Sequence, residues 1–437
     1  MHVRAERLAV AAVALLAAAA AAPAPCRAQP PQTVDVWPNG PVRTVAEALD
    51  RARPGGRVVV HPGVYREPTI VVRKPVQIVG EGFPVLDGEG QRQIMTVAAP
   101  GVTVRGLHFR NVGASYTEDR AAIKVVQTTD CTIEGNRIDD AFFGIYLARV
   151  SRCRVAGNEL RATAGSEAAS GNGIHLWTAD GVTITDNHVV GHRDGIYFEF
   201  VRDGEVRGNV SEGNLRYGLH FMYSDDCRYL DNTFRRNGAG VAVMYTKRVE
   251  MIGNRFEHNW GSAAYGLLLK EITDVRVERN RFRRNTTGLF VDGTTRLVAD
   301  GNEFVDNGWA LRLDANAQDG RVTRNDFVGN TFDVATNGTE TGTAFDGNYF
   351  DGYEGYDLDR DGYGDVPHRP VRLFSIVVER NEPALILLRS FFVRLLDGAE
   401  RLVPALTPSA LADPRPAMRR RQQWQQQQRR PAPGGAR

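Results

Sequence analysis

A short pattern of polar and apolar residues returns about every 22 residues along most of the chain. Each return is marked by an asparagine, and an apolar residue follows two positions later in every repeat but the one containing Ser211. The asparagines are Asn136, Asn158, Asn187, Asn209, Asn232, Asn254, Asn280, Asn302, Asn325 and Asn348. Many repeats then continue with a glycine and alternating apolar residues, as in residues 173–176. Alternation with a period of two predicts a β-strand, and self-similarity at this spacing predicts a solenoid.

Short strands that return without an intervening helix predict an all-β fold, a right-handed parallel β-helix with about 22 residues per coil over residues 33–350. Equivalent side chains of successive coils then lie about 4.8 Å apart, the spacing of strands in a sheet. Asparagine suits the corners because it tolerates a left-handed backbone, and stacked amides can hydrogen-bond along the axis. A leucine-rich horseshoe has a similar period, but the leucine scaffold that it needs is missing here.

Both ends of such an array need a cover, because an open coil exposes unpaired backbone groups. Residues 44–53 predict a short amphipathic cap helix, with strands following at 58–60, 70–72 and 76–79. After residue 371 the repeat ends, and an apolar stretch predicts a helix that begins at Pro383 and runs to about Leu402. This helix either caps the last coil or lies against a membrane or a membrane-embedded partner.

The two ends of the chain have the composition of a targeting segment and a tail. Residues 1–28 have a charged start, an apolar run and a small residue at Ala28, which is typical of a secretory signal peptide. An uncleaved anchor and a lipoprotein modified at Cys26 are the alternatives. Residues 419–437, rich in Arg, Gln and Pro, predict a disordered tail.

The formal net charge of +2 comes from the arginines of these two ends, so the body between them is acidic. An acidic body excludes a nucleic-acid-binding protein, which needs a concentrated basic face. The scarcity of long apolar runs likewise excludes an integral transporter.

One outward-facing ladder carries residues with metal-binding chemistry. The first and third residues after each strand glycine are apolar and face inward, so the second and fourth face outward. This alignment makes Met222 and Met244 neighbours in adjacent coils, beside His220 and on the same face as His175. Thioether sulfur and imidazole select Cu(I) over harder metals, so these four residues are candidate copper ligands. The alternative is an exposed apolar strip that binds a partner or lies under a loop.

Three cysteines, Cys131, Cys153 and Cys227, share one phase of the repeat. Valine or leucine occupies that phase in other coils, so we expect the thiols to face the core as small hydrophobic side chains. Parallel Cβ vectors on stacked coils disfavour a disulfide between Cys131 and Cys153.

The segment 351–370 is rich in Asp and Gly and contains a pattern like that of a calcium loop. Positions 1, 3, 5 and 9 of the pattern are Asp357, Asp359, Asp361 and Asp365. Glycine stands at position 6, but histidine replaces the usual bidentate glutamate at position 12. The alternative is a turn held by its own side-chain-to-backbone hydrogen bonds.

Several segments resemble the NosD family. The most specific are residues 355–375 (GYDLDRDGYGDVPHRPVRLFS), 381–390 (NEPALILLRS) and 406–418 (LTPSALADPRPAM). Residues 217–227 (YGLHFMYSDDC) and 240–254 (GVAVMYTKRVEMIGN) look similar too, so the resemblance extends from about residue 33 to 418. The repeats alone are shared with carbohydrate-binding and sugar-hydrolase β-helices and specify a fold, not a function.

The resemblance implies a periplasmic maturation factor of nitrous oxide reductase, seated on a membrane permease that a cytoplasmic ATPase drives in an ABC-type complex. It implies that the complex helps to assemble the copper–sulfur cluster of the reductase, with a copper-chaperone lipoprotein as a further partner. The chain itself would be no enzyme but a docking platform and a transient Cu(I) relay. Residues 371–418 would then be a helical segment that contacts the membrane partner.

Two other functions stay open. A periplasmic polysaccharide lyase or epimerase would need a groove with an acid/base pair and basic residues that neutralise a uronate. The residues available on one side of the coils are Asp194, Glu199, His220, Asp225 and Lys270. The third possibility is a pure scaffold without bound metal.

Overall fold

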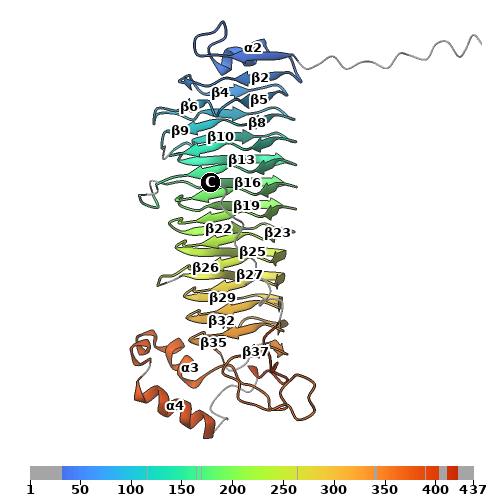
Figure 1. The fold of residues 1–437 in the computed structure, drawn as a ribbon, viewed down its shortest axis with the longest axis vertical. Helices are drawn as coiled ribbons and strands as arrows, with labels where there is room; N and C mark the ends of the chain where they lie inside the picture. Colours follow the sequence, from blue (N-terminus) through green and yellow to red (C-terminus); the bar gives the residue numbers. More distant parts are fainter. Residues whose placement is uncertain are drawn as a thin grey trace, which may run out of the picture. The chain divides into compact units, whose positions relative to one another are not determined.

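The computed structural model describes residues 32–421 except 116, 164, 169, 263, 339–341, 389 and 403–410. The predicted signal peptide and all but the first three residues of the predicted tail therefore lie outside the described residues. From Thr33 onward the chain forms a stack of parallel β-coils, with helix α2 at one end and helices α3 and α4 at the other (Figure 1). The predicted fold class, an all-β parallel solenoid, is confirmed.

Each coil contributes strands to two parallel sheets. A 13-stranded sheet takes one strand per coil, from β3 (Val64–Tyr65) to β37 (Tyr349–Phe350). A 24-stranded sheet covers the remaining two sides of the coils, and it bends between them. On one of these two sides the strands include β11 (Thr132–Glu134), β14 (Arg154–Ala156), β17 (Thr183–Thr185), β20 (Glu205–Arg207), β23 (Arg228–Leu230), β30 (Thr295–Asp300), β33 (Gly320–Thr323) and β36 (Thr343–Asp346).

The other side of the large sheet, called the ladder face below, carries the candidate copper ligands. Its strands include β10 (Ala121–Val126), β13 (Phe143–Ser151), β16 (Ile174–Asp180), β19 (Ile196–Arg202), β22 (Tyr217–Met222), β25 (Ala239–Ile252), β27 (Tyr265–Glu278), β29 (Thr287–Asp292), β32 (Trp309–Leu313) and β35 (Phe332–Thr336). The longest two, β25 and β27, continue around the bend into the neighbouring side, so one strand pairs with both β22 and β23.

The interior is filled by columns of identical side chains. Rings that follow the repeat asparagines are fully buried and stack on one another with centroids 4.8 to 5.7 Å apart. They are Phe234, Phe256, Phe282, Phe304, Phe327 and Phe350. Among the described residues Cys131, Cys153 and Cys227 are free thiols and are buried, as the phase of the repeat predicts.

The repeat asparagines form a buried hydrogen-bonded ladder from coil to coil. In the rung at Asn232, both the backbone N–H and Nδ2 donate to Oδ1 of Asn254 at 3.0 Å, and Nδ2 also donates to the carbonyl of Val206 at 2.8 Å. The predicted amide stacking is therefore confirmed. The expected left-handed backbone at asparagine is wrong, because the positive φ falls on the residue before each one, as at Asp231 (φ 54) and Gly253 (φ 70).

Asp413 ends this ladder by taking the place of the next asparagine. Its Oδ2 accepts hydrogen bonds from the backbone N–H and Nδ2 of Asn348 at 2.9 and 2.8 Å. Its Oδ1 accepts from the backbone N–H of Gly347 at 3.1 Å. The carboxylate is fully buried, so residues 411–421 return to the last coil and satisfy donors that would otherwise be left without acceptors.

The predicted N-terminal cap helix is confirmed as α2 (Val45–Arg51). Thr44 caps it, with Oγ1 accepting from the backbone N–H of Glu47 at 3.1 Å. The carboxylate of Glu67 accepts the N–H groups of Val45 and Ala46 at 2.9 and 3.0 Å, which satisfies two more donors of the first turn.

The C-terminal segment differs from the single helix predicted from Pro383 to Leu402. It contains α3 (Leu373–Arg380), a 3₁₀ turn η1 (Glu382–Leu387) and α4 (Phe391–Leu402). Pro383 is the second residue of the 3₁₀ turn, and the extended backbone of Leu388 (ψ 128) separates that turn from α4. The apolar run predicts one helix because helical propensity does not register a single extended residue.

Helix α3 covers the last coil. Its Phe374 and Val378 are buried, and the Phe374 ring packs against Phe332 of β35 with centroids 6.1 Å apart. Helix α4 leaves large apolar side chains exposed. No helix in the described part of the chain is long and apolar enough to cross a membrane.

A second, shorter asparagine ladder leads to a prediction at His192. The ladder comprises Asn214, Asn237, Asn259, Asn285, Asn307 and Asn330. His192 occupies the same corner one coil earlier, where its backbone N–H donates to Oδ1 of Asn214 at 3.0 Å. Its ring is buried, and neither ring nitrogen has a hydrogen-bond partner among the described residues. Burial lowers the pKa of His192 to about 4.

We expect His192→Asn to extend this ladder by one rung and to remove a pH dependence. Between pH 6.5 and 4, His192 is protonated in the unfolded chain but stays neutral in the folded protein. The unfolding free energy of the wild type therefore falls with falling pH. The stability advantage of the variant should therefore grow by about 2 kcal/mol from pH 7 to pH 5. Urea unfolding of both proteins at pH 7 and pH 5 measures this difference in unfolding free energy. The same difference at both pH values would contradict the expectation.

The end of the main ladder gives a second prediction. Asp413→Ala leaves the donors of Asn348 and Gly347 buried without acceptors, which should cost about 2–4 kcal/mol of unfolding free energy. Asp413→Asn is the matched control, because its amide oxygen restores the acceptor of an ordinary rung and should retain most of the stability. Thermal unfolding distinguishes the two, and equal losses in both variants would refute the capping role.

Candidate functional site

Two outward columns run along the ladder face in the register that the repeat predicts. The first column contains Tyr146, His175, Tyr197, His220, Ala242, Leu268, Phe290 and Arg312. The second contains Ala148, Trp177, Glu199, Met222, Met244, Lys270 and Asp292. Met222 on β22 therefore lies directly opposite Met244 on β25, about 4.8 Å apart along the stack. Both methionines are partly exposed.

His220 stands two residues before Met222 on the same strand and the same face. Its side chain is enclosed by Tyr217, with ring centroids 4.6 Å apart, and by the edge of Tyr197 at 5.2 Å. The histidine is only 6% exposed, yet neither ring nitrogen has a hydrogen-bond partner among the described residues. Both nitrogens of this imidazole are therefore buried and without a hydrogen-bond partner in the described part of the chain.

Burial, together with the nearby charge of Arg216, lowers the pKa of His220 to about 4. The imidazole is therefore neutral at pH 7. Neutral imidazole is the form that binds metal, so no proton has to be displaced before binding.

His175 lies on the same face but apart from the other three candidate ligands. Two rungs separate it from His220, roughly 10 Å, and the ring of Tyr197 lies between them. His175 is stacked between Tyr146 and Tyr197, with centroids 4.5 and 4.7 Å away, and Nδ1 contacts Nδ2 of Asn172 at 2.9 Å. Burial lowers its pKa to about 3. The structure thus groups His220, Met222 and Met244 and leaves His175 outside their reach.

Charged residues border the methionine pair on both sides. Glu199 is the register partner of Met222 on the preceding strand, and Lys270 is the partner of Met244 on the following strand. Lys270 in turn forms an ion pair with Asp292 at 3.7 Å. Ala242, the register partner of His220, is fully buried, and the rings of Tyr217 and Tyr265 lie 6.4 Å apart across the same coil. The enclosing Tyr217 was not identified from sequence, because it precedes the strand glycine and lies outside the alternation used to assign outward positions.

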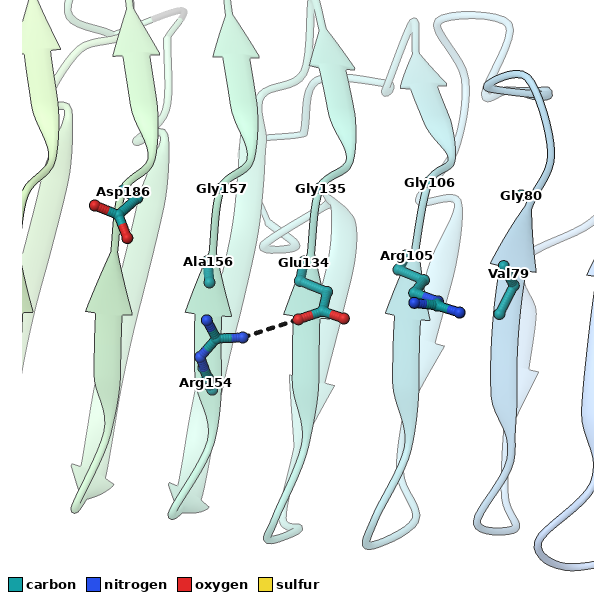
Figure 2. A pocket seen from close by; sticks show the side chains of 10 residues that line it. All are labelled: Val79, Gly80, Arg105, Gly106, Glu134, Gly135, Arg154, Ala156, Gly157 and Asp186. Carbon is teal, nitrogen blue, oxygen red and sulfur yellow. Dashed lines mark hydrogen bonds and ion pairs between the residues drawn. The ribbon is translucent and has the colours of Figure 1, made fainter.

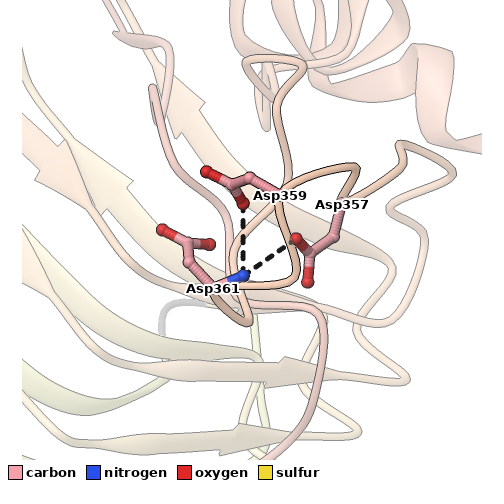
Figure 3. Close-up of side chains that lie close together, drawn as sticks. All are labelled: Asp357, Asp359 and Asp361. Atoms are coloured by element: carbon pink, nitrogen blue, oxygen red, sulfur yellow. Dashed lines mark hydrogen bonds between the residues drawn. The ribbon is translucent and has the colours of Figure 1, made fainter.

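The Asp-rich loop gathers three of its four candidate carboxylates. Oxygen atoms of Asp357, Asp359 and Asp361 lie within 4.8 Å of one another (Figure 3). The backbone N–H of Asp361 donates to Oδ1 of Asp357 at 3.1 Å and to Oδ1 of Asp359 at 3.2 Å. Asp365 lies outside this group and accepts from the N–H of Leu358 at 2.7 Å. The side-chain-to-backbone bonds of a self-supporting turn are thus present, and calcium remains a hypothesis resting on three carboxylates.

A shallow hollow of about 520 Å³ lies on the neighbouring side of the large sheet, around Arg105, Glu134 and Arg154 (Figure 2). Arg154 donates to Glu134 at 2.8 Å, so the carboxylate in its centre is already paired. The residues considered for a sugar-processing site also have structural roles. Asp194 is fully buried, and Asp225 accepts from the backbone N–H of Lys247 at 2.9 Å.

Comparison with known proteins agrees with the resemblance of the sequence motifs. The sequence model of the periplasmic copper-binding protein NosD matches residues 162–355, the part of the chain that contains the methionine pair. A probable ABC transporter binding protein NosD from Pseudomonas aeruginosa is 31% identical over 394 residues, which cover 86% of this chain and 92% of that protein. This chain belongs to the NosD family. A second member, from Stutzerimonas stutzeri, is 28% identical over 365 residues, covering 80% of this chain and 84% of its own.

Solved structures share the coil architecture with this NosD-family chain. A GH87 α-1,3-glucanase catalytic unit from Streptomyces thermodiastaticus has a TM-score of 0.55 at 16% identity and covers 74% of this chain and 67% of its own. PfbA, a surface adhesin of Streptococcus pneumoniae, has a TM-score of 0.53 at 11% identity and covers 67% of this chain and 88% of its own. At such identities the likeness shows the β-helix fold alone.

Proposed function

We propose that this chain is the periplasmic, non-enzymatic subunit of an ABC-type complex that assembles the copper–sulfur cluster of nitrous oxide reductase. In that complex it serves as a docking platform and as a transient Cu(I) relay, while ATP is hydrolysed on a cytoplasmic partner. Membership of a family described as periplasmic copper-binding supports the role. The names of its relatives, ABC transporter binding proteins, support the type of complex.

The register of Met222 and Met244 beside the unpartnered His220 is the observation that carries the copper role. Two thioethers and one neutral imidazole form a soft donor set of three, which suits Cu(I) and disfavours calcium, magnesium or zinc. The rigid sheet holds these donors without a closed cage, so an incoming donor can replace one of them. His175, two rungs away, would be a separate binding step on the same face.

Contact with the membrane permease is assigned to the C-terminal helices. The large apolar side chains exposed on η1 and α4 are Ile386, Leu387, Phe391, Phe392 and Leu395. Because α3 already covers the last coil, these side chains are not needed to close the β-helix. An exposed apolar patch of this kind fits a partner surface embedded in or near the membrane.

Copper binding by the methionine pair can be tested directly. We expect the purified protein to bind Cu(I) under anaerobic, reducing conditions in competition with the chelator bicinchoninate. Met222→Leu combined with Met244→Leu keeps the volume of the side chains but removes both sulfur atoms, and it should abolish this binding. Met418→Leu, on the C-terminal segment, is the matched control. Unchanged copper binding in the double variant would overturn the relay.

The docking role of α4 has its own test. Phe391→Glu combined with Leu395→Glu should abolish co-purification with the permease, because two charges replace the exposed apolar contact. The β-helix should keep its thermal stability, since neither side chain packs on the coils. A control pair, Tyr356→Glu with Leu358→Glu, places charges on exposed apolar residues of the Asp-rich loop and should leave the complex intact. Retention of the complex by the α4 variant would contradict the assignment.

A further inference from the structure

A strip of exposed aromatic rings runs beside the methionine pair. Phe200, Tyr223 and Tyr245 occupy the same corner of three successive coils, where the large sheet bends away from the ladder face. Their rings stack in parallel, with centroids 5.4 Å apart for the first two and 5.3 Å apart for the last two. Each residue is 42–48% exposed, which is unusual for three adjacent aromatic side chains.

All three residues of this aromatic strip have a left-handed backbone, with φ values of 55, 50 and 56°. That conformation costs an L-residue with a bulky side chain about 1–2 kcal/mol. Asparagine and glycine adopt it more readily. The three aromatic residues therefore adopt this backbone at a conformational free-energy cost that asparagine or glycine would not incur.

The same corner in neighbouring coils shows that the fold does not require aromatic side chains there. Thr178 (φ 56°) precedes the strip, and Glu271 (φ 52°) and Gly293 (φ 61°) follow it, all with the same backbone conformation. The bend thus demands a positive φ in each of these coils but accepts threonine, glutamate or glycine. The fold thus requires the backbone conformation of this corner but not three exposed aromatic rings, and exposed apolar side chains gathered in one place point to an interaction surface.

The aromatic strip joins the methionine pair to a polar hollow. Tyr223 and Tyr245 directly follow Met222 and Met244 in the chain, so the strip adjoins the methionine pair along two neighbouring strands. On the other side lies a hollow of about 520 Å³ that is lined by residues including Asp180, Arg202 and Asp225. An apolar centre with a rim of both charges is the composition of a protein–protein interface. A membrane-binding surface would instead concentrate lysine and arginine.

We propose that the aromatic strip is the docking surface for a protein that delivers Cu(I) to Met222 and Met244. The proposal rests on the proposed function, because it takes the methionine pair as the copper site. Transfer by ligand exchange requires donors of both proteins on the same ion, so the delivering protein must approach within a few ångströms of the methionine sulfur atoms. A protein that approaches over the adjoining strip covers its rings, whereas a small copper chelate need not touch them.

The backbone conformation supplies a clean test. The triple variant Phe200→Asn, Tyr223→Asn, Tyr245→Asn removes the rings and places at each corner a residue that favours a positive φ. We expect its thermal stability to equal or exceed that of the wild type. Cu(I) taken from bicinchoninate should bind with unchanged affinity. Transfer from the Cu(I)-loaded copper-chaperone lipoprotein, expressed without its lipid, should slow at least tenfold. Glu271→Asn, in the same corner, is the control and should transfer at the wild-type rate.

The outcomes separate this proposal from the copper role itself. Wild-type transfer rates in a stable triple variant would overturn the docking surface and leave the methionine pair in place. Loss of chelator-supplied copper in that variant would also overturn it, since the rings would then act on the site and not on a partner. If the strip instead binds vesicles of phosphatidylglycerol, its partner is a membrane. If it holds two copies of this chain together in sedimentation, its partner is a second copy. Either result would overturn the proposed delivering protein. Failure of the Met222 and Met244 double substitution to affect copper binding would refute the proposed function.

Discussion

The in-register parallel pairing of each coil with the next is the constraint on which the rest of the structure depends. Parallel pairing leaves buried corners whose backbone groups cannot all reach a partner strand. The asparagine ladders solve this problem, since each amide accepts two donors from the coil before it and donates to a carbonyl there. A slip of one residue would break the ladder and the phenylalanine stack together and would turn the inward side chains outward. The register is therefore determined several times over.

Because the interior fixes the register in several ways, the outer face is rigid and its side chains have fixed spacing. Side chains on the ladder face recur at one spacing, and their identity is free to vary because folding is settled by the interior. The face holds His220, Met222 and Met244 in fixed register without a dedicated loop or a disulfide. It can also hold strained aromatic residues at the bend, because the surrounding coils over-determine the backbone there. The hydrogen bonds of the asparagine ladders offset the conformational free energy of these strained surface residues.

The C-terminal end shows how the array is closed and where an apolar surface stays exposed. Asp413 completes the hydrogen bonds of the last asparagine, and α3 buries the apolar end of the last coil. With both kinds of group satisfied, α4 is left with an apolar surface that has no role in closing the coils. Helix α4 packs Val393 and Leu396 against the same end cluster and leaves Phe391, Phe392 and Leu395 exposed on its other side.

The sequence by itself determined the coil, its period and the side on which each repeat residue lies, because equivalent positions recur often enough to average out local exceptions. It placed Met222 opposite Met244 and the three cysteines in the core for this reason. Only the tertiary structure decided features that occur once or that join distant segments. It brought Asp413 to Asn348, enclosed His220 between Tyr197 and Tyr217, separated His175 from the other candidate ligands, and broke the predicted helix at Leu388. These contacts depend on packing between segments that no repeat relates, so periodicity carries no information about them.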